Sequence, residues 1–407
     1  MFNDPKKEDR LLFLLAFAFF AHVMDFVIMM PLGDSLMKKL DIQPNQFSYV
    51  VSIYSLMAAI CGFINAMFMD KFDRKHVLMV TMTGFTLGTF WCGFANSYES
   101  LLIARGFTGA FGGVTGGVIM SIVSDVIPFQ RRGRAMGIIS GAFSIASIAG
   151  VPFGLFLATR LNDWHAPFIF FGIVSTISTI TSWFMIPNVN GHVVEGEGYK
   201  SPFVLINGIL SDKNQVNALS WTFFLIVGHF LIIPFLNPVF INNHGFPEQR
   251  IPLMYFIGGI ASILPAVFIG KITDKMGAKR VYVLMVFLAA IPVLIITNVV
   301  HLSIGCIYFI MVAYFILGAG RMIPANTMVT SSVNQTTRGS FMSIRSVFIE
   351  LGEGVAAFLG GQILVKTVDG KFQHFNWLGY LATAICIGTI VFAFRAIVVK
   401  EEIQNLE

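Results

Sequence analysis

Charged side chains are scarce in this chain. Aspartate, glutamate, lysine and arginine make up only 12% of its 407 residues, which is about half the share found in an average soluble domain. Hydrophobic residues make up 56%. This balance excludes an ordinary soluble protein and places the chain in lipid.

Cysteine is also rare, and motifs for catalysis or cofactor binding are missing. The four cysteines (Cys61, Cys92, Cys306 and Cys386) lack the paired spacing of metal or redox centres, so no metal site and no cofactor is expected. The sequence has no nucleophile elbow, no metalloprotease HExxH motif and no phosphate-binding loop. An enzyme is therefore not predicted.

Apolar runs recur along the whole chain. A helix needs roughly 20 apolar residues to cross the hydrocarbon core of a bilayer, and the runs predict an all-α membrane protein with twelve transmembrane helices. No cleavage-like site follows the first run, so it is expected to remain as helix 1 rather than to be removed as a signal peptide. The expected helices cover residues 11–38, 46–69, 76–95, 99–127, 134–160, 165–187, 215–242, 249–272, 279–299, 303–333, 339–366 and 374–397.

The basic residues are distributed unevenly between the two membrane faces. Of the 27 lysines and arginines, 18 fall in loops on the side of both termini, six fall in the opposite loops and three fall within predicted spans. Positively charged loops stay in the cytoplasm, so both termini are predicted to be cytoplasmic. The same sidedness explains the net charge of +5 without nucleic acid as a partner.

A short basic turn occurs twice. Residues 270–280 read GKITDKMGAKR, and residues 66–76 read AMFMDKFDRKH with the same spacing. This turn resembles the signature loop of the major facilitator superfamily, GxxxD[RK]xG[RK][RK], which lies between helices 2 and 3 and, more loosely, between helices 8 and 9. The second copy fits the pattern well, whereas the first departs from it at Ala66 and Asp73.

Pairs of residues recur along the chain at a nearly constant offset. Asp70 and Asp274 are 204 residues apart, and His22 and His229 are 207 residues apart. Such a repeat predicts two pseudo-symmetric six-helix bundles that enclose a cavity where they meet. The predicted halves and the cytoplasmic linker between them are residues 1–187, 215–407 and 188–214.

A glycine- and proline-containing sequence lies within the fifth predicted helix. Residues 150–154 read GVPFG, with Gly150, Pro152 and Gly154 in a partial match to GxxxGPxxGG. This pattern resembles the motif of drug and proton antiporters, in the variant of their sugar, arabinose and purine efflux branch. The resemblance implies export in exchange for protons. A kink at these residues is expected to act as a hinge at the interface between the halves.

The basic turns are predicted to act as a gate at the cytoplasmic face. Asp70 is expected to meet the positive N-terminal end of the eleventh helix, and Arg74 is expected to pair with Asp125. Asp274 and Arg280 take the corresponding places in the second half. The alternative is that these charges only set topology and solubility.

Six charges fall well inside predicted spans, away from the helix ends, and none of them is expected to face lipid. Each costs about 2.5–3.5 kcal/mol at mid-helix even on the lenient insertion scale. The equal numbers of each sign suggest mutual pairing in a polar cavity. The acids are Asp25, Glu350 and Glu353, and the arginines are Arg105, Arg321 and Arg345.

The three acids are the candidates for proton coupling. Asp25 is the first choice, because it lies one helical turn from His22 near the middle of the first helix. The alternative is a structural ion pair of Asp25 with Arg105 or another base. Glu350 and Glu353 are three residues apart, so they share a helix face and resist ionising together. They are predicted to form a second proton site or a site for a cationic substrate, or else a neutralised network between helices.

The remaining polar residues within spans are candidates for lining the cavity. Arg321 is the one that suits an anionic substrate, because a guanidinium binds carboxylates and phosphates in a bidentate manner, and this leaves the substrate charge open. The full set of cavity candidates is His22, Arg105, His229, Asn237, Arg321, Asn326 and Arg345.

These observations predict a monomeric secondary transporter in the plasma (inner) membrane, which exports a small organic solute or drug in exchange for protons. An importer, symporter or uniporter on the same scaffold is the alternative within transport, because the fold does not set direction. A divalent-metal transporter with His22, Asp25 and His229 as ligands is a rarer alternative. A membrane receptor would lack a reason for buried charges in both halves. The expected partners are the substrate, protons and the lipid bilayer.

Overall fold

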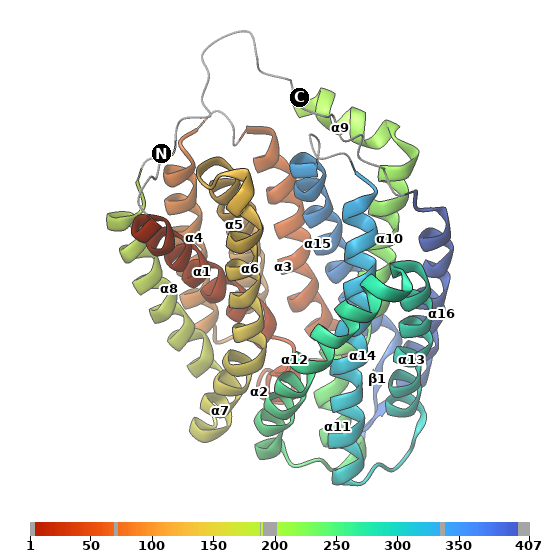
Figure 1. Cartoon of the computed structure of the whole chain (residues 1–407). Helices are drawn as coiled ribbons and strands as arrows, with labels where there is room; N and C mark the ends of the chain where they lie inside the picture. Colours follow the sequence, from red (N-terminus) through yellow and green to blue (C-terminus); the bar gives the residue numbers. More distant parts are fainter. Residues whose placement is uncertain (1–4, 69–71, 188, 190–201, 334–337, 398–407) are drawn as a thin grey trace.

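Helices account for nearly all of the structure. The computed structural model describes residues 5–68, 72–187, 189, 202–333 and 338–397, and Figure 1 shows a bundle of long helices with a small hairpin at one end. The helical segments are α1 (Pro5–Ile28), α2 (Gly33–Lys39), α3 (Pro44–Phe68), α4 (Arg74–Gly93), α5 (Tyr98–Val126), α6 (Phe129–Ile145), the π-helical η2 (Ala146–Gly150), α7 (Val151–Leu161), α8 (His165–Met185), α9 (Pro202–Ser211), α10 (Lys213–Phe230), η3 (Ile233–Phe235), α11 (Leu236–His244), η4 (Glu248–Arg250), α12 (Ile251–Met276), α13 (Ala278–Asn298), α14 (Ile304–Ser331), α15 (Arg338–Ile363) and α16 (Phe375–Arg395). The hairpin pairs β1 (Val365–Lys366) with β2 (Phe372–Gln373) in antiparallel register.

Ten helical segments of the described chain are long and apolar enough to cross a membrane. Three of them are composite, since α6, η2 and α7 form one continuous segment, α10, η3 and α11 form another, and η4 and α12 form a third. The helices α4 and α15 are comparably long, with 20 and 26 residues. They are less apolar, because α4 is rich in threonine and glycine and α15 carries Arg345, Glu350 and Glu353. The predicted count of twelve spans includes both of these helices.

Several of the predicted helix limits differ from the structure, and the predicted span 339–366 includes β1, because α15 ends at Ile363. The helix α6 begins at Phe129 rather than at residue 134, because Pro128 has φ −56° and ψ 145° and the helix starts directly after it. The first predicted span, residues 11–38, is divided into α1 and α2 by a turn that contains Pro31. A proline lacks the backbone N–H that an uninterrupted helix needs, so the helix ends before Pro31.

The helices pack in two sets, which we name the N-terminal set (α1–α8) and the C-terminal set (α10–α16). Within the N-terminal set α5 packs on α3 and α4, and within the C-terminal set α14 packs on α12 and α13. The sets meet where α3 packs along α15 and where α7 packs against α12. This grouping follows the predicted halves, whose standing as separate domains stays a prediction.

Glycines on α5 let its backbone touch that of α3. A Cβ added at Gly109 would lie 2.2 Å from the carbonyl oxygen of Tyr54, and one added at Gly113 would lie 2.3 Å from that of Ala58. Both distances are far below a van der Waals contact, so only glycine fits at these positions. Small residues of this kind allow close helix packing in membranes.

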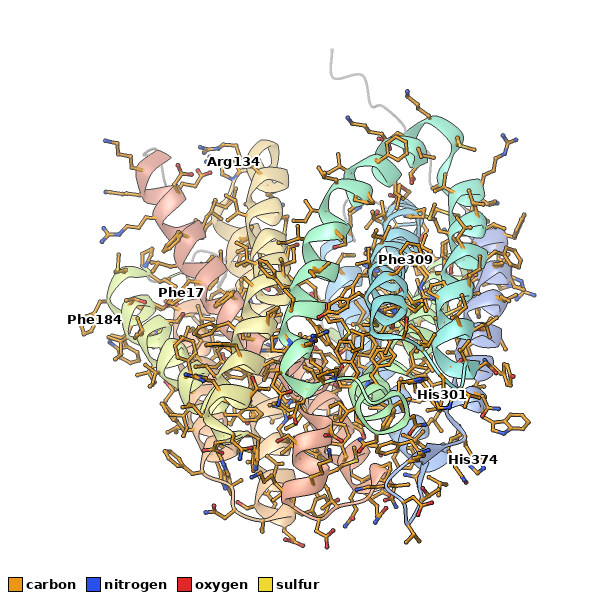
Figure 2. All side chains as sticks on the ribbon, turned by 90° about the horizontal axis from the view of Figure 1, so that it is seen from below. Phe17, Arg134, Phe184, His301, Phe309 and His374 are labelled. Carbon is orange, nitrogen blue, oxygen red and sulfur yellow. The ribbon has the colours of Figure 1, made fainter. Side chains whose placement is uncertain are left out.

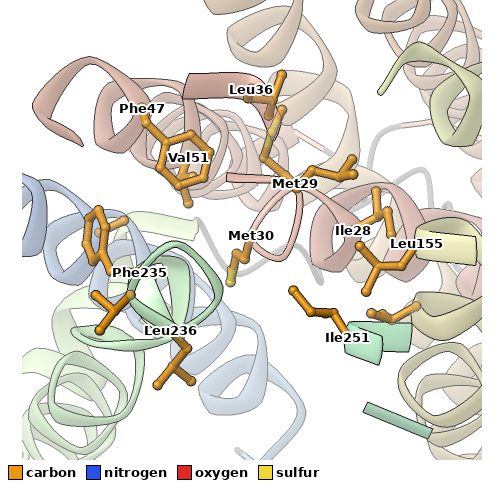
Figure 3. Packing of buried hydrophobic residues seen from close by; sticks show 14 of the residues in the cluster. Ile28, Met29, Met30, Leu36, Phe47, Val51, Leu155, Phe235, Leu236 and Ile251 are labelled. Carbon is orange, nitrogen blue, oxygen red and sulfur yellow. The ribbon is translucent and has the colours of Figure 1, made fainter. Parts of the chain in front are cut away.

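The two ends of the bundle differ in how the sets are joined. Figure 1 shows α9 at one end, which we name the linker end, and α2, α11 and β1 at the other, which we name the far end. At the far end, one cluster of buried side chains contains residues of both sets. Figure 3 shows Ile28, Met30 and Leu155 of the N-terminal set close to Leu236 and Ile251 of the C-terminal set.

At the linker end the buried side chains belong to separate clusters. One cluster, with Leu11, Leu78 and Ile127, is confined to the N-terminal set. Another, with Ile209 and Phe341, is confined to α9 and the C-terminal set. The sets are therefore packed together at the far end and have separate cores at the linker end.

Large apolar side chains cover much of the outside of the bundle. Phe184 and Phe309 are 81% and 77% exposed, and both are labelled in the view from below in Figure 2. An apolar surface of this extent is typical of a protein in contact with lipid.

Candidate functional site

An ion pair lies inside the N-terminal set. Arg105 on α5 places Nη1 2.7 Å from Oδ2 of Asp25 on α1, and the two side chains are 1% and 0% exposed. The Arg105 guanidinium also lies over the ring of Tyr54 on α3, 4.2 Å from its centroid, in a cation–π contact. The Tyr54 hydroxyl is 3.5 Å from Nδ1 of His22. The pairing of Asp25 with an arginine, considered from the sequence as its structural role, is thus present.

Burial makes the two charges of this pair depend on each other. Taking each ion out of water costs several kcal/mol, which the mutual attraction offsets only while both partners are charged. A neutral Asp25 would leave Arg105 as an uncompensated buried cation. Any change in the protonation of Asp25 must therefore be accompanied by a change around Arg105.

The two acids of α15 lie at the junction between the sets. Glu353 is buried and Glu350 is half-buried, and α15 packs on α3 here, with the Cα of Gly354 facing Leu56. Both acids lie within electrostatic range of the Tyr54 hydroxyl, and they act on each other. Neither acid has an ion-pair partner among the described residues, and Oε2 of Glu350 has no hydrogen-bond partner.

A second buried arginine lies in the C-terminal set, without a carboxylate. Arg321 on α14 is 3% exposed. Its Nη1 donates to Sγ of Cys386 at 3.0 Å, and its Nη2 donates to Nδ1 of His229 at 2.9 Å. Its Nε has no partner, nor does the hydroxyl of Tyr314, whose ring stacks on that of His229 at 6.1 Å.

The third arginine lines a small hollow in the C-terminal set. Arg345 on α15 donates from Nε to Oγ1 of Thr222 at 3.2 Å and from Nη2 to Oδ1 of Asn326. Trp221 and Met322 lie beside it in the same lining. The hollow has room for about one water molecule. Arg345 and Asn326, both predicted as cavity residues, are therefore brought together, and Asn326 is exposed and does not line the hollow.

Asparagines of α11 join the two sets at the far end. Asn237, predicted to line the cavity, is 1% exposed and donates to the carbonyl oxygen of Pro31 at 3.0 Å. Asn242 donates to Oδ1 of Asp34 at 2.5 Å, and the other oxygen of Asp34 lies 2.7 Å from Nζ of Lys38. We name the two bonds between the sets, Asn237 to Pro31 and Asn242 to Asp34, the far-end closure.

Sequence reasoning missed most of the far-end closure. Asn242, Asp34 and Pro31 were not among the predicted site residues. The available signal was the presence of Asn237, Asn242 and Asn243 in a short and otherwise largely apolar stretch, since amides in apolar surroundings need hydrogen-bond partners.

The predicted gate at the linker end is present in part. Nε of Arg74 lies 3.0 Å from Oδ2 of Asp125, which is the pairing expected from the sequence. Asp274 and Arg280 are exposed, and within the described residues neither forms an ion pair. Asp70 lies outside the described residues. The role of these charges in gating stays a prediction.

The predicted hinge coincides with an irregular part of a helix. The segment η2 ends at Gly150, and Pro152 lies in the first turn of α7. A single π-helical turn is a frequent cause of bending in a helix. A Cβ on Gly150 would lie 1.9 Å from Sδ of Met24, and one on Gly154 would lie 2.7 Å from Cδ1 of Ile28. The two glycines therefore let α1 lie directly against this π-helical turn and the start of α7.

The residues considered as metal ligands, His22, Asp25 and His229, are not part of a metal-binding cluster in the described structure. Within the described part of the chain, no group of three or more histidine, cysteine, aspartate or glutamate side chains is placed to hold a metal ion. His22 and Asp25 lie in the N-terminal set beside Arg105, whereas His229 lies beside Arg321 in the C-terminal set. A cation next to each histidine opposes the binding of a metal cation.

The sequence matches a family model over nearly its whole length. The model is described as Major Facilitator Superfamily and matches residues 15–297 and 222–405. Among curated relatives, Multidrug resistance protein 1 of Bacillus subtilis (strain 168) is 25% identical over 374 residues, which cover 90% of this chain and 92% of the relative. Multidrug resistance protein 2 of the same organism is 24% identical over 380 residues, with the same coverage.

The fold is similar to that of solved transporters. A crystal structure of a bacterial homolog to the human lysosomal transporter Spinster, in an inward-facing and unoccupied conformation, gives a TM-score of 0.72 at 15% sequence identity. The alignment covers 97% of this chain and 96% of that protein.

Proposed function

Since the chain belongs to the major facilitator superfamily, we propose that it is a proton-coupled exporter of a small organic solute, which works by alternating access. Membership of this family makes it a multi-pass membrane transporter rather than an enzyme. Export, exchange with protons and location in the plasma (inner) membrane are parts of the proposal. They are supported by the GVPFG sequence of the fifth predicted helix and by relatives that are named multidrug resistance proteins.

Twelve membrane-spanning helices are part of this proposal. The ten apolar segments become twelve when α4 and α15 are included, and these two helices pack along α5 and α3 within the bundle. An even number of spans agrees with the excess of lysine and arginine on the side of both termini. This assignment makes the linker end cytoplasmic, and we expect the protein to act as a monomer.

The conformation described here is the one open toward the cytoplasm in this scheme. Side chains of both sets share a buried cluster at the far end, where Asn237 and Asn242 bond across the boundary. The cores at the linker end are separate. Transport then requires that the far-end closure opens and that the linker ends of the two sets approach each other, as in rocking of two halves around a central site.

The acids of α15 are the proton carriers that we rank first. Asp25 has a buried arginine at 2.7 Å, whereas Glu350 and Glu353 have no cation partner among the described residues. They also lie at the surface where the sets meet, so a change in their charge acts directly on the packing of α15 against α3. We place Asp25 second, as a residue that responds through Arg105.

One observation carries the proposal most strongly, namely two neighbouring carboxylates without cation partners at the junction of the sets. A fixed negative charge there would be expensive in an apolar environment, so the acids need a proton or a ligand in each state. The binding and release of that proton can then shift the balance between the two packings of the sets.

The direct test uses the purified protein in sealed proteoliposomes with an imposed pH gradient and a panel of labelled organic cations, neutral solutes and carboxylates. Exchange predicts that a transported solute accumulates in vesicles with an acidic lumen, because protons leave as the solute enters. Symport predicts accumulation only when the outside is acidic, and a uniporter is indifferent to the gradient. Binding of a solute without any transport would refute the proposal in favour of a receptor.

A further inference from the structure

We propose that Arg321, His229 and Tyr314 form a binding subsite for a carboxylate group of the transported solute. This inference rests on the proposed function, because it names the chemical class of the substrate. We name these three residues the Arg321 subsite. Its basis is a buried guanidinium to which the described chain supplies no negative charge.

The N-terminal set contains a comparable buried arginine, Arg105, which has a carboxylate partner. Arg105 is buried beside a histidine and is neutralised by Asp25, three residues after His22. The offset of 207 residues that relates His22 to His229 places Ile232 at the position of Asp25. Ile232 is a buried member of an apolar cluster. The second half thus keeps the arginine and the histidine but not the acid.

The groups that bond to Arg321 are neutral acceptors, and two donors at this site have no acceptor. A guanidinium has only N–H donors and does not lose its proton in proteins, so Nδ1 of His229 must accept the bond from Nη2, which leaves the imidazole proton on Nε2. The thiol of Cys386 is a weak acceptor. Nε of Arg321 and the hydroxyl of Tyr314 have no partner, although these residues are only 3% and 6% exposed. Buried N–H and O–H donors without acceptors, next to a permanent positive charge, are the groups that bind an anion.

The charge balance favours a single carboxylate over a phosphate. One guanidinium neutralises a monoanion, whereas a phosphate dianion would leave an excess negative charge in an apolar environment. The planar guanidinium edge also matches the two oxygens of a carboxylate. The neighbouring side chains include Phe230 and Phe315, which pack by their rings against His229 and Tyr314. An apolar, preferably aromatic, body attached to the carboxylate fits these neighbours.

The Arg321 subsite is separate from the proton carriers. Arg321 bonds to Cys386 of α16 and His229 of α10 inside the C-terminal set, whereas Glu350 and Glu353 belong to α15, which packs on α3 at the junction of the sets. A carboxylate bound at Arg321 therefore leaves the α15 acids available to the proton. Export of a monoanion in exchange for one proton moves two positive charges inward, so a membrane potential that is negative inside would drive it together with the pH gradient.

The test measures thermal stabilisation of the purified full-length protein at constant ionic strength. The probes are phenylacetate, phenylbutyrate and phenyloctanoate, each compared with the alcohol and the amine of the same carbon skeleton. Ligands that bind the folded state raise its apparent stability. At least one carboxylate is expected to stabilise the protein, with an apparent affinity about tenfold or more above that of its alcohol and amine.

Variants assign this preference to the subsite. Arg321→Gln should abolish it, and Arg321→Lys should weaken it, because lysine keeps the charge but loses the bidentate geometry. Tyr314→Phe should weaken it without lowering the stability of the ligand-free protein, since the hydroxyl has no partner to lose, and this variant keeps the test valid if Arg321→Gln fails to fold. Arg395→Gln removes an exposed arginine of α16 and should change nothing.

Two results would overturn the inference. One is that no carboxylate of the series stabilises the protein more than its alcohol, and the other is that Arg321→Gln keeps the carboxylate preference. Either can occur while proton-driven transport is intact, in which case only the substrate class is wrong. Carboxylate-specific binding without transport would instead preserve the Arg321 subsite and refute the proposed transport.

Discussion

Asp25 and Arg105 form an ion pair from which water is excluded, with Oδ2 and Nη1 2.7 Å apart. Removing one partner of such a pair leaves the other as an unpaired buried charge, which costs about 3–5 kcal/mol. We therefore expect Asp25→Asn and Arg105→Gln each to lower the free energy of unfolding by this amount. The double variant should lose much less than the sum of the two. Thermal unfolding in detergent measures all three variants, and additive losses would contradict this account of the pair.

The α15 acids give a prediction about coupling. A gradient of one pH unit supplies about 1.4 kcal/mol per proton, enough for about tenfold accumulation of a neutral solute exchanged for one proton. The double variant Glu350→Gln/Glu353→Gln should lose this accumulation because neither amide binds a proton in this range. It should keep solute-for-solute counterflow, which needs no net proton movement.

The two single variants separate the roles of Glu350 and Glu353. The variant that loses gradient-driven accumulation identifies the proton carrier. If the double variant accumulates solute as steeply as the parent while Asp25→Asn does not, the ranking of the acids proposed above is wrong.

The far-end closure predicts a shift in conformation. Asn242→Leu removes the bond to Asp34, and a net hydrogen bond contributes about 0.5–1.5 kcal/mol, so the population open at the far end should rise about twofold to tenfold. A cysteine at Ser35, which lines a small hollow at this closure, reports the opening through its rate of modification by a membrane-impermeant maleimide. The measurement uses a background in which the native cysteines are replaced.

A matched control is available at the same end of the molecule. Asn96 is exposed and donates to the carbonyl oxygen of Phe94, so its bond lies within the N-terminal set. Asn96→Leu should leave the labelling rate at Ser35 unchanged. Equal effects of Asn96→Leu and Asn242→Leu would mean that the bond to Asp34 does not hold the sets together.

The contact between Gly150 and Met24 can be tested by a substitution in each residue. Gly150→Ala places a methyl group 1.9 Å from Sδ of Met24, and overpacking of this kind costs about 1–3 kcal/mol. The substitution should lower the unfolding temperature and slow transport. Met24→Ala makes room for the methyl group, so the double variant should recover part of both losses.

Another glycine of the same composite helix serves as the reference. Nothing lies within 4 Å of a Cβ built on Gly141, and alanine is a better helix former than glycine by up to about 1 kcal/mol. Gly141→Ala should therefore be neutral or stabilising. If it reduces transport as strongly as Gly150→Ala, flexibility of the backbone and not contact with α1 is the property that matters.

Local chemistry in the sequence was sufficient for several features. The turn at Pro31, the irregular helix before Pro152 and the close approach of α5 to α3 all follow from proline and glycine, whose backbone preferences act over a few residues. The pair Arg74–Asp125 was expected, and the pair Asp25–Arg105 was the alternative to proton coupling, because a charge inside a span, or at its end, needs a partner and few are available.

Contacts between distant polar residues could not be found in this way. The bond from Asn242 to Asp34 joins residues 208 positions apart, and it depends on how two helix pairs meet. Asn237 was expected in the cavity because an amide in a span suggested a polar space, but its partner is the backbone carbonyl of Pro31, in the turn between α1 and α2. The lack of an acid beside Arg321 could not be predicted either, since equal numbers of acids and arginines lie well inside the predicted spans.

The close approach of α5 and α3 has a mechanical consequence. Because Gly109 and Gly113 bring the two backbones into contact, these helices cannot slide past each other without a steric clash. Asp25 is tied to α5 through Arg105, and Arg105 is covered by Tyr54 of α3. We therefore expect α1, α3 and α5 to move together when a change at the α15 acids displaces α3.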